Sequence, residues 1–184
     1  MPRFAALLRG VNVGRVNRVP MGELRALLEA LGYRDVRTLL NSGNAVFSAG
    51  SGGTRAHAEG IGRGLFTRLG IDVPVIVKSA REWAVIEAEN ALAGQANDAS
   101  RLLIAVAADA KALAALAPLA SLVEPPETWH LGTHAAYLRC PNGSLQSRAG
   151  AALLGRQGRA ATTRNWATVL KIAALLRDGD APRR

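Results

Sequence analysis

Cysteine and aromatic residues are scarce in this chain. Cys140 is its one cysteine among 184 residues, so no disulfide can form within the chain, which indicates a reducing compartment. Aromatic residues make up 4%, so alanine, leucine and valine must fill most of the interior. The shortage of aromatic rings also disfavours a nucleic-acid surface that works by stacking on bases.

Acidic residues are missing from two long stretches. No Asp or Glu precedes Glu23, none lies between Glu127 and Asp178, and the formal net charge is +9. A positive field of this kind favours phosphate-bearing or acidic partners and speeds their encounter. The alternative is that arginines coat the surface without any specific partner, and composition alone leaves both interpretations open.

Long uninterrupted apolar runs are also absent, although 49% of the residues are hydrophobic. The longest candidate, residues 102–123, is interrupted near its middle by Asp109 and Lys111. The apolar run at residues 4–8 is too short for a signal peptide. We therefore expect a folded cytoplasmic protein with no membrane partner. The oligomeric state is not encoded in any pattern that we can identify.

The apolar periodicity predicts the element order β-α-β-β-α-β twice. The first series consists of a strand at 3–8, a helix at 20–31, a hairpin of strands 36–40 and 45–48, a helix at 58–69 and a strand at 73–77. The second consists of a strand at 102–107, a helix capped by Asp109, a hairpin of strands 127–131 and 135–139, a helix at 145–154, a strand at 159–162 and a final helix capped by Thr163.

This order predicts an α+β protein made of two ferredoxin-like βαββαβ subdomains with antiparallel sheets, followed by a C-terminal helix. We place the N-terminal subdomain at residues 1–78 and the C-terminal subdomain at residues 101–184. Residues 79–100 then form a connecting helix and linker. The helix should begin at a capping box, because Ser79 is followed three residues later by Glu82.

The topology predicts that two polar loops meet. Right-handed crossovers make the first two strands of each subdomain parallel, so the end of strand one, the start of helix one and the hairpin tip share one rim. The N-terminus of the first helix adds partial positive charge to that rim. The candidate ligand-binding residues on the two loops are Arg9, Asn12, Gly14, Arg15, Asn17, Asn41, Ser42 and Asn44.

The rim carries no recognisable catalytic motif. The glycine spacing between Gly10 and Gly14 matches neither a P-loop nor a dinucleotide-binding loop. No positioned pair of carboxylates is visible, and Glu23 is the nearest acid. The residue types favour a binding site, with Arg9, Arg15 and Arg18 supplying charge. The alternative is that the asparagines only satisfy loop backbone, as asparagine often does in turns.

Other candidates are weaker. Thr163, Arg164 and Asn165 form a possible second anion site if they open the last helix, and the alternative is that they merely anchor that helix. His130 and His134 are four residues apart but flank a glycine in an expected hairpin, so we expect no metal site. Cys140 is expected to be a small buried filler rather than a nucleophile.

Several segments together resemble the bacterial family called domain of unknown function 1697. The motifs that carry the resemblance are LLRGVNVG (residues 7–14), VPM (19–21), ELRALLEALG (23–32), SGN (42–44) and ATTRNW (161–166). The chain departs from the family pattern at Arg15, where a second glycine is usual, and at Asn41, where glutamine is usual. The resemblance implies two similar α+β subdomains and implies no activity, cofactor or substrate.

Three hypotheses about function follow from the sequence. The first is that the rim binds a phosphate-bearing ligand, which could be a nucleotide, a sugar phosphate or RNA. The second is an enzyme acting on a phosphorylated metabolite, with Glu23 or a substrate group carrying the proton. The third is an interaction module without a ligand, whose basic flanks recruit an acidic partner.

Overall fold

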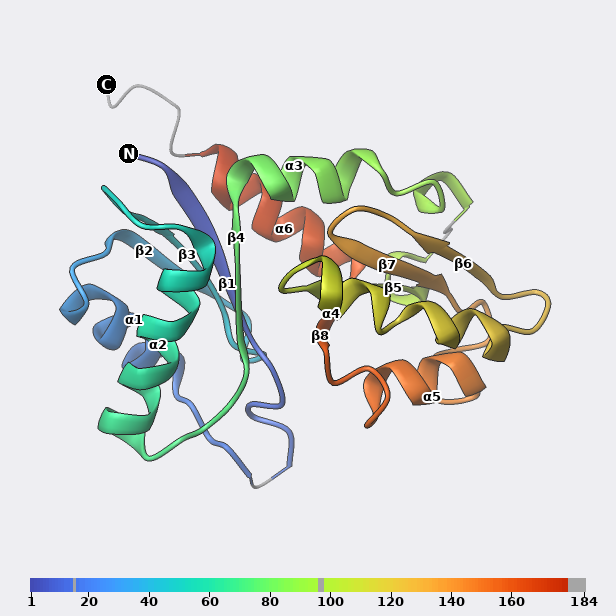
Figure 1. The fold of residues 1–184 in the computed structure, drawn as a ribbon, viewed down its shortest axis with the longest axis horizontal. Coiled ribbons are helices and arrows are strands. Elements are labelled where there is room, and N and C mark those ends of the chain that lie inside the picture. The colour runs from blue at the N-terminus through green and yellow to red at the C-terminus, as the bar shows by residue number, and fades with distance from the viewer. Residues whose placement is uncertain (15, 96–97, 179–184) are drawn as a thin grey trace. The chain divides into compact units, whose positions relative to one another are not determined.

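The computed structural model describes residues 1–14, 16–95 and 98–178, and its strands form two four-stranded antiparallel sheets (Figure 1). The chain divides into two compact units, which we call the first and the second unit. The first consists of Met1–Trp83 together with the chain from Ile172, and the second of Ala84–Lys171. The sequence-based boundaries had assigned the end of the last helix to the C-terminal subdomain, whereas in the structure it groups with the N-terminal one.

The first unit has the predicted βαββαβ order, and its strands are arranged β2-β3-β1-β4. Strand β1 pairs antiparallel with both β3 and β4, as in a ferredoxin-like sheet. The elements are β1 (Arg3–Leu8), α1 (Met21–Ala30), β2 (Arg34–Leu39), β3 (Asn44–Ser48), α2 (Thr54–Leu69) and β4 (Val75–Ser79).

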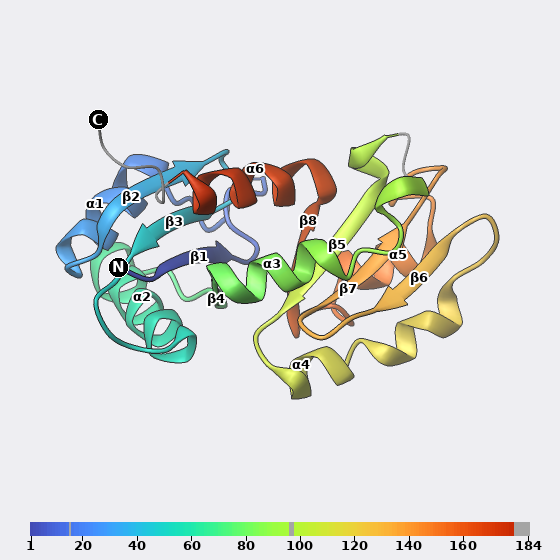
Figure 2. The same cartoon turned by 90° about the horizontal axis from the view of Figure 1, so that it is seen from above.

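Helices α1 and α2 pack against one face of this sheet and bury its core (Figure 2). Leu24 and Leu28 of α1, with Ile61 and Leu65 of α2, are fully buried, and burying each of them contributes about 1.5–3 kcal/mol. The two helices approach closely at Gly64, where a Cβ would lie 2.8 Å from Cδ1 of Leu27. The predicted apolar stripes therefore face the core as expected.

A buried imidazole lies among aromatic rings in the same core. His57 of α2 contacts Phe4, Tyr33 and Phe47, with ring centroids 4.6, 5.3 and 5.6 Å away. The Tyr33 hydroxyl lies 3.0 Å from His57 Nδ1. Burial lowers the pKa of His57, and the backbone carbonyl of Gly52 offsets part of that shift. Burial therefore favours the neutral form of the ring.

Helix α3 (Ala80–Ala88) begins at the predicted capping box. The Ser79 amide donates to Glu82 Oε2 (2.8 Å), and the Glu82 amide donates to Ser79 Oγ (3.2 Å). The reciprocal pair satisfies amides that the first turn of a helix leaves without a backbone acceptor. Two short 3-10 helices, η1 (Ala93–Gln95) and η2 (Ala99–Arg101), follow.

The second unit repeats the strand arrangement as β6-β7-β5-β8. Its core is closed by leucines and alanines from α4, η3 and α5, which face alternate residues of the sheet. The elements are β5 (Leu102–Ala107), α4 (Ala110–Ala114), η3 (Ala117–Leu122), β6 (Thr128–Leu131), β7 (Ala135–Arg139), α5 (Arg148–Leu154) and β8 (Ala161–Asn165). Helix α6 (Trp166–Arg177) begins in this unit, and its residues from Ile172 belong to the first. The predicted fold class is confirmed.

The end of the second series differs from the sequence-based expectation. Thr163 does not cap the last helix, because it lies inside β8 opposite Ala105 of β5. Asn165 is the cap instead, and its Oδ1 accepts the Thr168 amide at 2.9 Å. Pairing with β5 thus extends the strand three residues beyond the predicted end at Thr162.

No helix in the described part of the chain is both long and apolar enough to cross a membrane. The interrupted apolar run at residues 102–123 is divided in the structure among β5, α4 and η3. The cytoplasmic location stays a prediction.

Candidate functional site

The two predicted loops of the first unit meet where β1 ends. The Leu8 amide donates to the Gly43 carbonyl at 2.8 Å, which fixes the hairpin tip against the end of β1. Gly43 has φ +73°, and a Cβ there would lie 2.6 Å from Cγ2 of Val11. Only glycine fits this conformation and this contact without strain. The rim that the topology predicts is therefore present.

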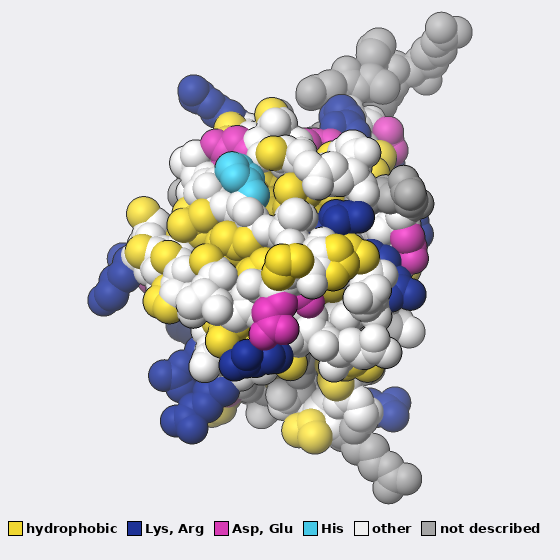
Figure 3. Space-filling view, turned by 90° about the vertical axis from the view of Figure 1, so that its right-hand side faces the viewer, with side chains coloured by type: hydrophobic (Ala, Val, Ile, Leu, Met, Phe, Trp, Pro, Cys, Tyr) yellow, Lys and Arg dark blue, Asp and Glu magenta, His cyan; other side chains and the backbone are white. Residues whose placement is uncertain are grey.

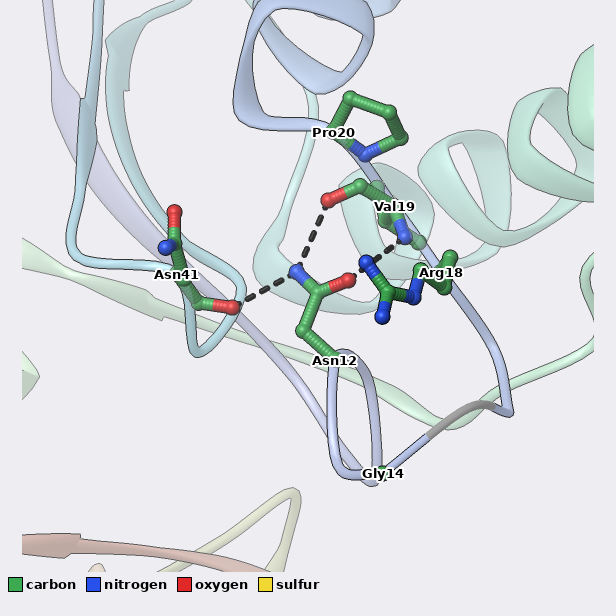
Figure 4. A pocket seen from close by; sticks show the side chains of 6 residues that line it. All are labelled: Asn12, Gly14, Arg18, Val19, Pro20 and Asn41. Carbon is green, nitrogen blue, oxygen red and sulfur yellow. Dashed lines mark hydrogen bonds between the residues drawn. The ribbon is translucent and has the colours of Figure 1, made fainter.

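Asn12 ties the two loops together with its side chain (Figure 4). Its Nδ2 donates to the carbonyl oxygens of Val19 (2.8 Å) and Asn41 (2.7 Å). Its Oδ1 accepts the Val19 amide at 2.9 Å. Both amide hydrogens are thus committed to the loops, so Asn12 builds the site more than it offers hydrogen bonds to a ligand.

The segment between β1 and α1 folds back on itself. The Asn12 amide donates to the Asn17 carbonyl (3.1 Å), and Val13 bridges to Val16. Asn12 and Asn17 have φ +57° and +50°, which asparagine tolerates better than most residues. Gly14 lies in this turn with φ +63°. Arg15, a predicted site residue, lies outside the described residues.

Asn44 and Ser42 stabilise the hairpin. Asn44 is fully buried, and its Nδ2 donates to the Leu39 carbonyl and to Ser42 Oγ, both at 2.9 Å. With both amide hydrogens used and no exposed surface, the Asn44 side chain holds the hairpin tip. Asn44 was predicted to bind the ligand, and the structure instead favours the backbone role that the sequence left open.

A hollow of about 310 Å³ opens between these loops and the start of α1. Its size is at the lower end of the range for small-molecule sites. Figure 4 shows that the Arg18 side chain faces this hollow beside Asn12 and Pro20. Among the described residues, the Arg18 guanidinium has neither a hydrogen-bond nor an ion-pair partner. The lining residues are Asn12, Gly14, Arg18, Val19, Pro20 and Asn41.

Pro20, at the N-terminus of α1, lines the same hollow. Pro20 precedes the helix, and no side chain caps it. The amides of the first turn have no acceptor within a helix, and they carry the positive end of the helix dipole. Glu23, the acid of that turn, is paired with Arg68 at 3.2 Å and does not line the hollow.

Arg9 is placed differently from the prediction. It is half-buried, its amide donates to the Pro74 carbonyl at 3.0 Å, and it does not line the hollow. Burial lowers the pKa of its guanidinium below the ordinary arginine value. Among the described lining residues, Arg18 supplies the positive charge, and the sequence had named it with Arg9 and Arg15 as a source of charge at the rim.

The predicted second anion site lies at the junction of β8 and α6. The buried Arg164 guanidinium donates to Thr162 Oγ1 and to the Thr163 carbonyl, both at 2.9 Å. Asn165 is occupied as the cap of α6. The Thr163 hydroxyl is buried within β8. These contacts anchor the junction of β8 and α6. They favour the alternative interpretation, in which these residues only hold the last helix in place.

The remaining candidates are the two histidines of the second hairpin and Cys140. His130 lies on β6 with its ring 5.4 Å from that of Tyr137, and His134 lies in the hairpin turn. Nowhere in the described chain do three His, Cys, Asp or Glu residues gather as a metal site would require. Cys140 is buried, and burial raises the pKa of its thiol, which disfavours the reactive thiolate.

On the side that carries β6 and α5, the basic residues form no continuous track. Figure 3 looks at the side on which β6 and α5 lie, where a band of apolar side chains crosses the middle and arginines or lysines are scattered around it. Phe66, in the first unit, is the one aromatic residue among the large exposed hydrophobics that the structure describes. A continuous nucleic-acid track on the β6–α5 side therefore has little support.

The family assignment rests on a match over most of the chain. A family model described as "Protein of unknown function (DUF1697)" matches residues 1–137. The chain belongs to this family. A solved structure, described as that of the conserved bacterial protein SP0830 from Streptococcus pneumoniae, is 26% identical with a TM-score of 0.80. The similarity covers 96% of this chain and 99% of that chain. No curated protein matches the chain.

The family match includes every residue of the hollow, and sequence reasoning missed two of them as lining residues. Val19 accepts and donates the hydrogen bonds that orient Asn12, and Pro20 leaves the start of α1 without a cap. The signal for Pro20 was visible, since a proline before an apolar helical stripe fixes where the helix begins. The signal for Val19 was not, because its role depends on backbone atoms.

Proposed function

We propose that this protein binds a small phosphate-bearing ligand, of the size of a sugar phosphate or mononucleotide, in the hollow beside Arg18. The observation that carries the proposal is the convergence of two kinds of anion partner on one space. The Arg18 guanidinium borders the hollow, and so does Pro20, the residue directly before the uncapped first turn of α1. A phosphate placed there would accept charge-assisted hydrogen bonds from both.

The surrounding loops support a pre-formed site. Asn12 uses its amide group to join residues 19 and 41, so the walls are held together before any ligand arrives. Ordering costs on binding are therefore small. The Asn41 side chain lines the hollow and, within the described chain, has no hydrogen-bond partner, so it can contact the rest of the ligand.

The test is a binding measurement with a matched control. Isothermal titration should detect inorganic phosphate weakly and ADP or ribose 5-phosphate more tightly, and the bound ligand should raise the melting temperature. Arg18→Gln should weaken binding by about 10-fold to 100-fold, because hydrogen bonds to charged groups contribute about 1.5–3 kcal/mol. Arg156→Gln removes an equal charge from an exposed position of the second unit and should leave affinity unchanged.

Two results would contradict the proposal. One is that none of these phosphates binds at millimolar concentration. The other is that Arg18→Gln and Arg156→Gln lower affinity equally, which would indicate a general effect of net charge. RNA binding would show instead as an affinity that falls steeply with salt and responds to both substitutions.

The enzyme hypothesis has less support from the geometry. Glu23, its proton carrier, is paired with Arg68 and lies outside the hollow. A ligand-free interaction module stays a hypothesis, and it predicts that every phosphate titration is flat.

A further inference from the structure

A second surface of the first unit lies on α2, around an exposed aromatic side chain. Phe66 is 62% exposed, the most exposed aromatic residue among the large hydrophobics that the structure describes. It borders a shallow hollow of about 480 Å³ lined by Gly62, Arg63, Phe66, Thr67 and Asp72. We call these five residues the α2 surface. A large exposed apolar side chain beside a hollow is typical of an interaction site.

Gly62 has no role that the single chain explains. Gly64 of the same helix is required by the close contact with Leu27. A Cβ at Gly62, in contrast, would meet no atom within 4 Å. A glycine inside a helix destabilises it by about 1 kcal/mol relative to alanine, and here no contact within the described chain compensates.

Gly62 and Phe66 are one helical turn apart and therefore lie on one face of α2. Gly62 leaves an opening, and Phe66 is a projecting side chain beside it. A two-fold axis across this face would place each Phe66 against the Gly62 opening of the other copy. Such self-complementarity is what an isologous interface between identical chains requires.

The charges of the α2 surface are also self-complementary. Arg63 and Asp72 line the same hollow, and neither lies within 4.0 Å of an opposite charge among the described residues, although the Arg63 charge helps to lower the pKa of Glu59. The same two-fold axis would bring Arg63 of one copy to Asp72 of the other. Each chain would contribute one cation and one carboxylate, so two identical pairs would form.

The neighbouring charges favour a second copy over an acidic partner. The chain carries a net charge of +9, which opposes the approach of two copies. Around the α2 surface, however, the other arginines are neutralised: Arg55 pairs with Glu59 at 2.9 Å, and Arg68 pairs with Glu23 at 3.2 Å. Two copies can therefore meet here without strong repulsion, whereas an acidic partner would gain little.

We infer that the α2 surface is a homodimer interface in which Phe66 of each copy packs against Gly62 of the other and Arg63 pairs with Asp72. One aromatic side chain and two exposed charge pairs would carry this interface, so we expect the dimer to dissociate in the micromolar range. This inference does not depend on the phosphate site, since the two hollows share no residue.

Sedimentation equilibrium over a micromolar-to-millimolar concentration series tests the inference. The wild-type chain should shift from monomer to dimer, and Phe66→Ala should weaken association by about 30-fold, as expected for a central aromatic anchor. Leu154→Ala removes an exposed apolar side chain from the second unit and should leave association unchanged. A monomer throughout the series, or equal behaviour of the two variants, would overturn the inference.

Gly62→Ala separates the interface from folding. The added methyl group meets nothing in the monomer, so the variant should melt at a higher temperature because alanine favours the helix. The same methyl group fills the opening for Phe66, so association should weaken by about tenfold. A variant that is more stable and associates as tightly as wild type would contradict the proposed packing.

Mixed variants test the charge pairs. Arg63→Asp and Asp72→Arg each place like charges together in their own homodimers, so each should remain monomeric. In an equimolar mixture every cross-pair is opposite in sign, so a heterodimer should form. An ion pair within one chain could not produce this recovery. Failure of the mixture to dimerise, when wild type does, would exclude the Arg63–Asp72 contact.

Discussion

The two units share one scaffold and differ at one rim. In the first unit the Leu8 amide at the end of β1 donates to the Gly43 carbonyl at 2.8 Å. In the second unit the Ala107 amide at the end of β5 donates to the His134 carbonyl at 3.0 Å. The same hydrogen bond thus joins strand end and hairpin tip in both units, so the scaffold itself fixes this contact.

The difference lies in how the chain continues after that hydrogen bond. Between β1 and α1 it forms the long connection 9–20, whereas between β5 and α4 only residues 108 and 109 intervene. In the second unit the Asp109 carboxylate caps α4 and accepts the Ala112 amide at 2.8 Å. In the first unit Pro20 leaves α1 uncapped. The candidate site is therefore an elaboration of one unit, and the other unit shows what the rim looks like without it.

The largest effect should come from filling the hairpin tip of the first unit. Gly43→Ala adds a Cβ that would lie 2.6 Å from Cγ2 of Val11 and 2.7 Å from Cβ of Leu8. The positive φ adds about 1–2 kcal/mol, and overpacking adds about 1–3 kcal/mol. We expect a loss of about 3 kcal/mol in the free energy of unfolding, measured by urea denaturation.

His134→Ala is the matched control for this substitution, because His134 accepts the equivalent hydrogen bond through its backbone carbonyl. Its loss should be well below that of Gly43→Ala. Equal losses would mean that the two hairpin tips are packed alike and that the comparison fails at this point.

The next largest loss of stability should come from changing Asn12, which has no counterpart in the second unit. Asn12→Asp keeps the shape and the Oδ1 acceptor but loses both donors, and it turns a carboxylate oxygen toward the carbonyls of Val19 and Asn41. We expect a loss of about 2 kcal/mol, from two hydrogen bonds of about 1 kcal/mol each.

Hydrogen–deuterium exchange should show where this loss occurs. Amides of residues 11–20 and 41–44 should exchange faster in Asn12→Asp, while those of β5 and β7 keep the wild-type rate. A uniform increase in exchange would instead assign Asn12 to global stability and remove the argument that it pre-forms the rim.

These residues also show how far the sequence leads. Apolar periodicity and turn residues are local signals, so they located α1, α2, β5 and both hairpins, and the topology then predicted that the loops near Asn12 and Gly43 meet. The hydrogen bonds of Asn12 could not be predicted, because they go to backbone carbonyls whose direction depends on positive φ values at Asn12 and Asn17.

The prediction that Thr163 caps the last helix was wrong for a related reason. Thr163 and Asn165 are both good capping residues, so the sequence offered two helix starts. Pairing with β5 continues to Asn165, which lies opposite Leu103, and this tertiary contact selects the later start. The predicted anion site at Thr163 and Arg164 depended on the earlier start.

A pH effect should also distinguish the units, because the buried imidazole of His57 belongs to the first. Its pKa is lowered by burial, so below about pH 6.5 the unfolded chain binds a proton more readily than the folded one. Stability should therefore be full above that pH and fall as the pH decreases, by at most about 1.4 kcal/mol per pH unit.

His57→Gln removes the titrating ring and retains a group that can bond to the Tyr33 hydroxyl. Its stability between pH 7 and pH 5 should depend less on pH than that of the wild type. Parallel curves for the two proteins in chemical denaturation would show that other groups cause the acid sensitivity.

A smaller effect is expected where the second unit caps its helix. Asp109→Ala removes the carboxylate that accepts the Ala112 amide, and loss of such a cap costs about 1 kcal/mol. Asp109→Asn keeps a capping oxygen and should recover most of the stability. If both variants lose the same free energy of unfolding, the negative charge of Asp109 stabilises α4 more than its capping hydrogen bond does.

The smallest change in stability should come from giving α1 a side-chain cap like the one that Asp109 provides for α4. Pro20→Asp places a capping carboxylate at the start of α1, where Pro20 has the extended backbone (φ −59°, ψ 134°) of a residue preceding a helix. The cap should stabilise the chain by about 0.5 kcal/mol. The same carboxylate would occupy the amides proposed for phosphate and repel the anion, so titrations with ADP or ribose 5-phosphate should become flat.

Pro20→Ser adds a neutral cap and should weaken binding less. A Pro20→Asp variant that still binds phosphate as tightly as wild type would show that the open helix terminus, the main difference between the two rims, has no part in binding.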